Sequence, residues 1–192
     1  MEIKRGDALN LLNGFDLIPD LIVTDPPYAF GGSGDEHALS ATVAIVLRES
    51  ARVLRSGGWM VVFCASSWRS TSYMVESVRG ILDPVRIGTW CKPKAKTKTR
   101  TPGWSWASVN AIAMRKGKSN PLRPSDLLDH ILESPITGGR RAEIPATVAL
   151  WAVKPFAIEG GVLLDPFAGS GRILEAGEQC GMRSVGFEKK DR

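Results

Sequence analysis

The chain has 192 residues and a net charge of +5, which suits one domain with a sizeable buried core and favours a polyanionic partner without identifying it. Three scattered cysteines and two histidines show neither a disulfide framework nor zinc-ligand spacing, which excludes a disulfide-stabilised fold and a metal site. The N-terminus has no apolar segment long enough for a signal or a membrane span, so we expect a soluble, cytoplasmic protein.

Short apolar runs alternate with amphipathic stretches along the chain, a pattern typical of an α/β sheet. Fully apolar runs predict buried parallel strands at 21–24, 59–65 and 162–164. Helices are expected at 37–54, 70–82, 146–153 and 172–180, the first because its apolar residues fall near one helical face. Further strands are expected at 85–91, 107–115 and 184–188. The segment 116–141, rich in proline, serine, glycine and charge, predicts a loop or short helices.

A glycine turn follows the last apolar run, in the sequence VLLDPFAGSGRIL. A buried strand that ends in an acid and continues through Gly-x-Gly into a helix marks the place where open α/β sheets bind ligands. Gly169 and Gly171 allow the backbone to approach a ligand closely. A third glycine and a P-loop lysine are missing, while Glu188 ends the next strand with a carboxylate suited to ribose hydroxyls. The pattern predicts a nucleoside ligand without a pyrophosphate; the alternative is a tight turn without a ligand.

The tetrapeptide Asp25-Pro26-Pro27-Tyr28 closes the first buried strand. If the ligand is S-adenosylmethionine, an aromatic exocyclic amine is a poor methyl acceptor, because its lone pair is delocalised into the ring. The Asp25 carboxylate and the Pro26 carbonyl can accept the two amine hydrogens and direct the lone pair at the methyl group. The two prolines fix the turn, and Tyr28 offers a stacking surface to a base that has left its helix. The alternative is an Asp-Pro turn that only ends a strand.

A basic segment with two tryptophans follows the strand expected at 85–91. Its members are Lys92, Lys94, Lys96, Lys98, Arg100, Trp104 and Trp106. Basic side chains interleaved with aromatic ones suit nucleic acid, through phosphate contacts and base stacking. Five phosphate contacts predict that log affinity falls with log salt at a slope of about −4.5. The alternative is a solvated surface loop.

These motifs resemble those of amino-methyltransferases that act on DNA bases, a family marked by [DNS]-P-P-[YFW] and F-x-G-x-G. Here the catalytic motif comes first and the cofactor motif last, as in the beta group of that family. The resemblance implies a Rossmann-like, S-adenosylmethionine-dependent methyltransferase fold of class α/β. Such a fold has a mostly parallel central sheet, helices on both faces and a circularly permuted motif order. One domain, 1–192, is expected, with 116–143 as a short variable segment in place of a full target-recognition region.

The resemblance also implies roles for individual residues. S-adenosylmethionine would be the cofactor and DNA the partner, with Asp25, Pro26, Pro27 and Tyr28 as catalytic residues. The implied cofactor-binding residues are Asp165, Pro166, Phe167, Ala168, Gly169, Ser170, Gly171, Glu188 and, at the adenine edge, Asp7. A solvent-exposed turn aspartate is the alternative for Asp7. Two positions depart from the family: Ile144-Pro145 stands where many members have Lys-Pro, and Arg172 replaces a threonine.

Adenine N6 is the expected methylation target, because Asp25 stands where cytosine-N4 members of the family tend to have serine. Cytosine N4, RNA and a protein amide are the alternative acceptors, and the motif order disfavours the last two. An alternative of another class is a catalytically silent nucleic-acid-binding relative, against which the two intact motifs argue. The short segment 116–143 implies weak sequence preference or the help of a second subunit, which makes a homodimer a candidate assembly.

Overall fold

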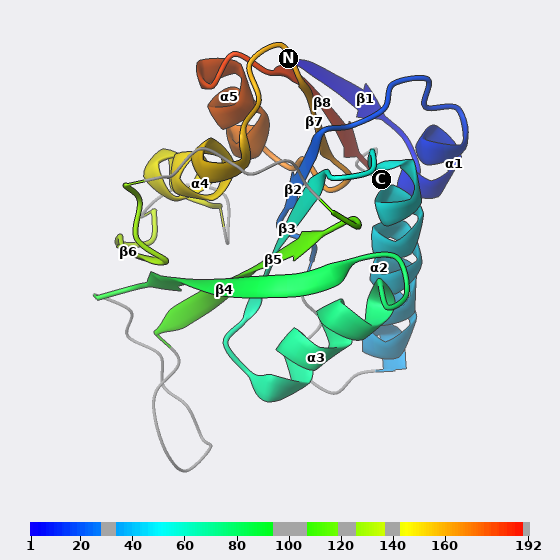
Figure 1. The fold of residues 1–192 in the computed structure, drawn as a ribbon. Coiled ribbons are helices and arrows are strands. Elements are labelled where there is room, and N and C mark those ends of the chain that lie inside the picture. Colours follow the sequence, from blue (N-terminus) through cyan, green and yellow to red (C-terminus); the bar gives the residue numbers. More distant parts are fainter. Residues whose placement is uncertain (28–33, 94–106, 119–125, 137–142, 190–192) are drawn as a thin grey trace.

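The computed structural model describes residues 1–27, 34–93, 107–118, 126–136 and 143–189, with the backbone alone over 34–40. Across these residues the strands form one eight-stranded sheet (Figure 1). The strands are β1 (Glu2–Arg5), β2 (Leu21–Thr24), β3 (Trp59–Ala65), β4 (Asp83–Cys91), β5 (Ser108–Arg115), β6 (His130–Leu132), β7 (Val162–Asp165) and β8 (Arg183–Glu188). The helices are α1 (Ala8–Asn13), α2 (Gly34–Val53), α3 (Trp68–Ser77), α4 (Ala146–Val153), the 3-10 turn η1 (Lys154–Phe156) and α5 (Arg172–Gln179).

The sheet is mostly parallel, as expected. Its strand order is β1-β8-β7-β2-β3-β5-β4-β6. In this order the first five strands, β1, β8, β7, β2 and β3, pair in parallel. Strand β5 runs antiparallel to both β3 and β4, and β6 pairs in parallel with β4. The first and last described strands, β1 and β8, pair in parallel at one edge of the sheet, so segments from the two ends of the sequence lie side by side.

Each face of the sheet is covered by its own group of helices. Side chains of β2 alternate between the faces, because successive residues of a strand point to opposite sides. Leu21 and Val23 pack in the core beneath α4 and α5, whereas Ile22 packs in the core beneath α1, α2 and α3. Figure 1 shows α4 and α5 together on one side and α2 with α3 on the other. Both cores are apolar, which accounts for the fully apolar strand sequences.

The predicted elements are present, whereas α1, β6 and η1 were not predicted. The predicted bounds of the helix at 146–153 are confirmed. The segment 116–141 was predicted as loop or short helices, but it contains the strand β6, which pairs with the edge of β4 at Thr89–Cys91. The helix α1 was also missed; it has six residues, too few for a helical period to stand out. None of the described helices is both long and apolar enough to cross a bilayer.

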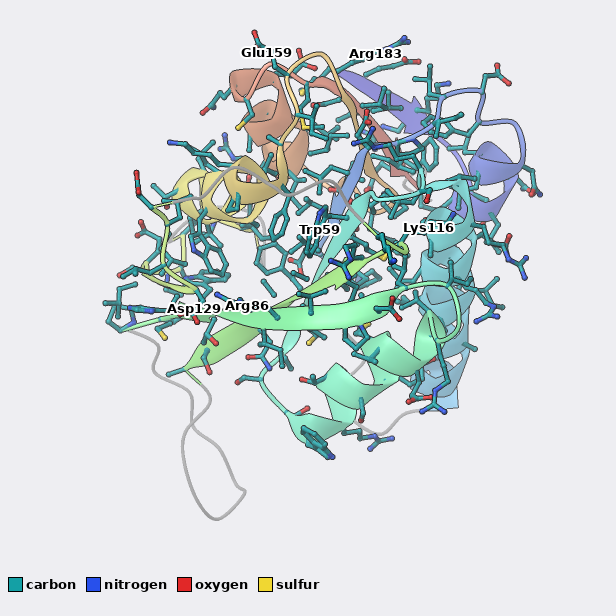
Figure 2. The ribbon with its side chains drawn as sticks, in the orientation of Figure 1. Trp59, Arg86, Lys116, Asp129, Glu159 and Arg183 are labelled. Atoms are coloured by element: carbon teal, nitrogen blue, oxygen red, sulfur yellow. The ribbon has the colours of Figure 1, made fainter. Side chains whose placement is uncertain are left out.

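Lys116 fastens the carboxyl end of α2 to the sheet. Its Nζ donates hydrogen bonds to the carbonyl oxygens of Ala51, Arg52 and Leu54, at 2.9, 2.6 and 2.6 Å. Figure 2 shows Lys116 beside this helix. Carbonyls at a helix end lack partners within the helix, and a cation there is also favoured by the helix dipole. The lysine at the end of β5 therefore stabilises the helix that connects β2 to β3.

We expect Lys116→Met to lower the free energy of unfolding by about 1–2 kcal/mol, because three carbonyls lose a charged donor. Urea unfolding of the purified protein measures this difference. Lys118→Met is the matched control, since Lys118 is exposed two residues further on. Equal stability of the two variants would show that the three hydrogen bonds contribute nothing.

Candidate active site

The two sequence motifs lie on neighbouring strands. Asp165 is the last residue of β7 and Asp25 directly follows β2, and these strands pair in parallel. After β7 the chain turns through α5 to β8, whereas after β2 it turns through α2 to β3 on the other side. Connections that leave in opposite directions open a crevice at the carboxyl ends of the strands, where ligands of α/β sheets bind. The permuted order thus still brings both motifs to one place.

A cavity of about 170 Å³ lies at this crevice. Its described lining residues are Asp25, Glu143, Ile144, Asp165, Phe167, Ala168, Gly169, Ser170, Arg172 and Ile173. The acid of the tetrapeptide and the glycine loop therefore face one shared space. Pro26 is buried and Pro27 is exposed beside it. Tyr28 lies outside the described residues.

The glycine loop is fixed by strand β8. Gly169 and Gly171 have φ angles of +51° and +86°, which side-chain-bearing residues rarely adopt. The backbone N–H of Gly169 donates to Oε2 of Glu188 at 2.7 Å. Gly186 of β8 allows the loop to lie against the strand, because a Cβ at position 186 would lie 2.6 Å from the Cβ of Ala168. One Glu188 oxygen thus orients the loop that the sequence had assigned to the cofactor.

Asp165 is a buried acid whose two carboxyl oxygens have different surroundings. Its Oδ1 accepts hydrogen bonds from Thr24 Oγ1 at 2.6 Å and from the N–H of Phe167 at 3.0 Å. Its buried Oδ2 has no hydrogen-bond partner among the described residues. Burial raises the pKa of Asp165 to about 7; the Thr24 and Phe167 hydrogen bonds lower it, and the charges of Asp25 and Glu188 raise it further. A buried oxygen without a partner in a cavity wall suits a ligand that carries a cation or a hydrogen-bond donor.

Asp25 acts electrostatically on groups from three other strands. Its charge raises the pKa of Asp165 on β7 and adds to the effect of burial, which lifts the pKa of the Cys64 thiol to about 11. Burial lowers the pKa of Lys92, at the end of β4, and the Asp25 charge raises it. At neutral pH Cys64 therefore remains a thiol, which is a weak nucleophile.

Lys92 lies against an aromatic ring and within the electrostatic reach of Asp25. Its Nζ lies 4.2 Å from the centroid of the Trp90 ring, within the range of a cation–π contact. The side chain is half-buried and senses the charge of Asp25. The predicted contact of Lys92 with phosphates stays a prediction. The other predicted nucleic-acid residues, Lys94, Lys96, Lys98, Arg100, Trp104 and Trp106, lie outside the described residues.

Asp7 caps a helix. Its Oδ1 accepts from the N–H groups of Leu9 and Asn10 at 3.0 and 3.3 Å, at the start of α1. The residue is exposed, and it is not among the residues that line the cavity. Its predicted contact with an adenine edge stays a prediction.

Sequence reasoning left Glu143 and Arg172 out of the site. Arg172 begins α5, and its Nε donates to Oε1 of Glu143 at 3.1 Å while its Nη1 donates to Oε2 of Glu175 at 2.9 Å. Arg172 had been noticed only as a departure from threonine, and Glu143 as the boundary of a variable segment. An acid two residues before Pro145, the N-cap of α4, and an arginine directly after the glycine turn were the available signals.

Comparisons with known proteins identify the family of the chain. A family model described as DNA methylase, N6_N4_Mtase, matches residues 85–192. The chain belongs to this family of DNA methylases. A relative in Escherichia coli (strain K12), named "Putative methylase YubD", is 28% identical over 202 residues, which span 96% of this chain and 82% of that protein.

Solved structures show the same fold over nearly the whole chain. The M1.HpyAVI complex with SAM superposes with a TM-score of 0.79 at 20% identity, over 99% of this chain and 94% of that one. TTHA0409 of Thermus thermophilus, complexed with S-adenosyl-L-methionine, gives 0.70 at 25%, over 97% and 87%. The cytosine-N4-specific PvuII DNA methyltransferase gives 0.71 at 18%, over 98% and 81%. The expected methyltransferase fold of this DNA methylase is therefore confirmed.

The raised pKa of Asp165 makes stability depend on pH. The folded protein holds this proton up to about pH 7, whereas the unfolded chain releases it near the ordinary pKa of 3.8. The stabilisation by the proton is thus fully present below pH 4 and is lost as the pH rises to 7. Asp165→Asn cannot ionise and keeps an acceptor for Thr24 and Phe167. We expect its stability relative to the wild type to increase between pH 4 and pH 7, by at most about 4 kcal/mol.

Urea unfolding of both proteins across this pH range measures the effect, and the difference between them cancels the titration of other groups. A difference that does not change with pH would show that Asp165 is ionised in the folded protein throughout.

Proposed function

We propose that this DNA methylase transfers a methyl group from S-adenosylmethionine to the exocyclic amine of a base flipped out of DNA, with adenine N6 as the target. The observation that carries the proposal is the shared cavity of Asp25 and the glycine loop. Membership of the family and two similar structures that hold this cofactor support the choice of methyl donor.

The residues of the cavity fit a cationic nucleoside. When bound, S-adenosylmethionine supplies its methyl group as an electrophilic carbon on a positively charged sulfur. The carboxylates of Asp25, Glu143 and Asp165 line the cavity, and Oδ2 of Asp165 is buried without a partner among the described residues. The strained turn at Gly169 and Gly171 lets the backbone approach the ligand. We assign Pro166, Phe167, Ala168 and Ser170 to the same binding loop, and the second oxygen of Glu188 to a ribose hydroxyl.

Asp25 and Pro26 prepare the methyl acceptor. Their carboxylate and carbonyl oxygens accept the two amine hydrogens, which turns the nitrogen lone pair toward the incoming carbon. After transfer the nitrogen carries one proton too many, and the Asp25 carboxylate is placed to receive it. Pro27 stiffens the turn and Tyr28 stacks on the base. Most of the rate enhancement comes from alignment, for which about 7–11 kcal/mol is available in well-oriented reactions.

The remaining predictions concern the DNA. Residues 94–106 supply phosphate and stacking contacts, and Lys92 stays beside Asp25. Residues 116–143 take the place of a target-recognition region, so sequence preference rests on this short segment or on a second copy of the chain in a homodimer.

Labelled S-adenosylmethionine incubated with DNA, RNA and protein tests the substrate class. We expect label in DNA alone, recovered as N6-methyladenine after digestion to nucleosides. Recovery of the label as N4-methylcytosine would show that cytosine is the target base, while the proposed methyl transfer to an exocyclic amine would still hold. Label in RNA or protein alone would refute the proposal.

Asp25→Ala removes one acceptor of the amine hydrogens and the acceptor of the leaving proton. We expect the transfer rate to fall at least about 100-fold while the affinity for the cofactor changes little. Single-turnover kinetics and calorimetric cofactor binding measure the two quantities separately, with Lys118→Met as the control. Equal losses of both would mean that Asp25 serves cofactor binding instead.

Salt dependence distinguishes Lys92 from the other basic residues. If four cations of the segment contact phosphates, log affinity for DNA falls with log salt at a slope of about −3.6. Lys94→Met should reduce this slope by about 0.9, whereas Lys92→Met should leave it unchanged and slow methyl transfer. Fluorescence anisotropy over a salt series measures the slopes. If Lys92→Met and Lys94→Met reduce the slope equally, Lys92 also contacts a phosphate.

A further inference from the structure

The cavity wall carries an uneven set of charges. Among its described lining residues there are three carboxylates, from Asp25, Glu143 and Asp165, and one cation, from Arg172. Ile144, the neighbour of Glu143, contributes only an apolar side chain to the same wall. Relative to the family pattern noted above, position 144 has lost a positive charge and position 172 has gained one. A negative group of any ligand in this cavity therefore has one described cation available to it.

Arg172 is held in place from two sides. Its Nε donates to Glu143, and its Nη1 donates to Glu175, one turn further along α5. The Glu143 side chain is only 13% exposed, whereas Arg172 is 41% exposed, so the carboxylate is the more enclosed member of the pair. A guanidinium has five N–H donors in a rigid fork, and these two bonds use two of them. Arg172 can keep its partners and still bind a carboxylate.

The charges of the wall complement those of the proposed cofactor. S-adenosylmethionine has two positive groups, the sulfonium and the α-ammonium, and one negative group, the α-carboxylate. The carboxylates of the wall match the first two. A bound cation favours the ionised form of Asp165, whose buried Oδ2 has no partner among the described residues and then acts as an acceptor. Arg172 matches the third, and bidentate binding of a carboxylate by a guanidinium is a strong and specific contact.

We propose that Arg172, positioned by Glu143 and Glu175, binds the α-carboxylate of the cofactor and gives the site its selectivity for the amino-acid end of S-adenosylmethionine. The proposal rests on the proposed function, because it takes S-adenosylmethionine as the ligand. It assigns the carboxylate to one side chain of this chain, at a position where the family pattern has threonine.

Three ligands test this assignment by calorimetric binding. S-adenosylhomocysteine has both the ammonium and the carboxylate, its decarboxylated analogue keeps only the ammonium, and 5′-methylthioadenosine has neither. We expect Arg172→Thr to lower the affinity for S-adenosylhomocysteine by about 10- to 100-fold. The affinities for the other two ligands should change by less than about 3-fold. Arg172→Lys, which keeps the charge but not the fork, should recover part of the loss.

Arg183→Thr is the matched control, since it makes the same substitution at an exposed arginine at the opposite end of β8 (Figure 2). It should leave all three affinities unchanged. Equal weakening of all three ligands by Arg172→Thr would overturn the proposal, because it would show that the arginine only shapes the loop. An unchanged affinity for S-adenosylhomocysteine would overturn it as well.

The two levels of the proposal fail in different ways. If the wild type binds neither S-adenosylmethionine nor S-adenosylhomocysteine, the proposed function is wrong. If the wild type binds both, and Arg172→Thr keeps the preference for the carboxylate, only the role of Arg172 is wrong. Should Arg172→Thr fail to fold, Arg172→Lys provides the test. The quantity to compare with the wild type is then the ratio of the affinities for S-adenosylhomocysteine and its decarboxylated analogue. A ratio equal to that of the wild type refutes the assignment.

Discussion

The parallel pairing of β2 with β7 is the constraint on which the site depends. Leu21 and Ile22 lie opposite Leu163 and Leu164, and the buried hydrogen bond from Thr24 Oγ1 to Asp165 Oδ1 joins the strand ends at 2.6 Å. Parallel neighbours need no direct connection along the chain, so it is immaterial which strand comes first in the sequence. Permuting the motif order therefore leaves the crevice intact, provided that both strands reach the centre of the sheet.

The site concentrates negative charge where burial makes it costly. Asp165 is almost completely buried, and its raised pKa reflects that cost. Two cations are associated with these acids: Lys92, which lies against Trp90 and senses the charge of Asp25, and Arg172, which pairs with Glu143. A positively charged ligand compensates buried acids, and an environment arranged in advance around developing charge is the largest single source of catalysis in many enzymes. The cost of burying the acids and the suitability of the cavity for a sulfonium thus have the same cause.

Sequence reasoning succeeded where one physical signal dominated. Fully apolar strands, an amphipathic helix such as α5 and the glycine turn each follow from burial or from the conformational freedom of glycine, and these are local properties. The strand β6 could not be predicted, because three residues pair with β4 only through contacts remote in sequence, supported by the hydrogen bond from Trp90 Nε1 to the Glu133 carbonyl. The environments of Lys92 and Glu143 could not be predicted for the same reason: they depend on Asp25 and Arg172, which lie far along the chain.

Close packing on β8 determines how precisely the cavity is shaped. Gly186 has no side chain, so Ala168 and Leu174 can lie directly against the strand, and a Cβ at this position would approach them to 2.6 and 2.7 Å. One strand position further, the Ala168 N–H donates to the Phe187 carbonyl at 2.9 Å, and Glu188 then takes the N–H of Gly169. Three successive residues of β8 thus fix the loop: Gly186 through close packing, Phe187 through a backbone hydrogen bond and Glu188 through a side-chain hydrogen bond. The placement of Arg172 follows from theirs, because the loop ends at the first residue of α5, and a shift of the loop would move the guanidinium away from Glu143.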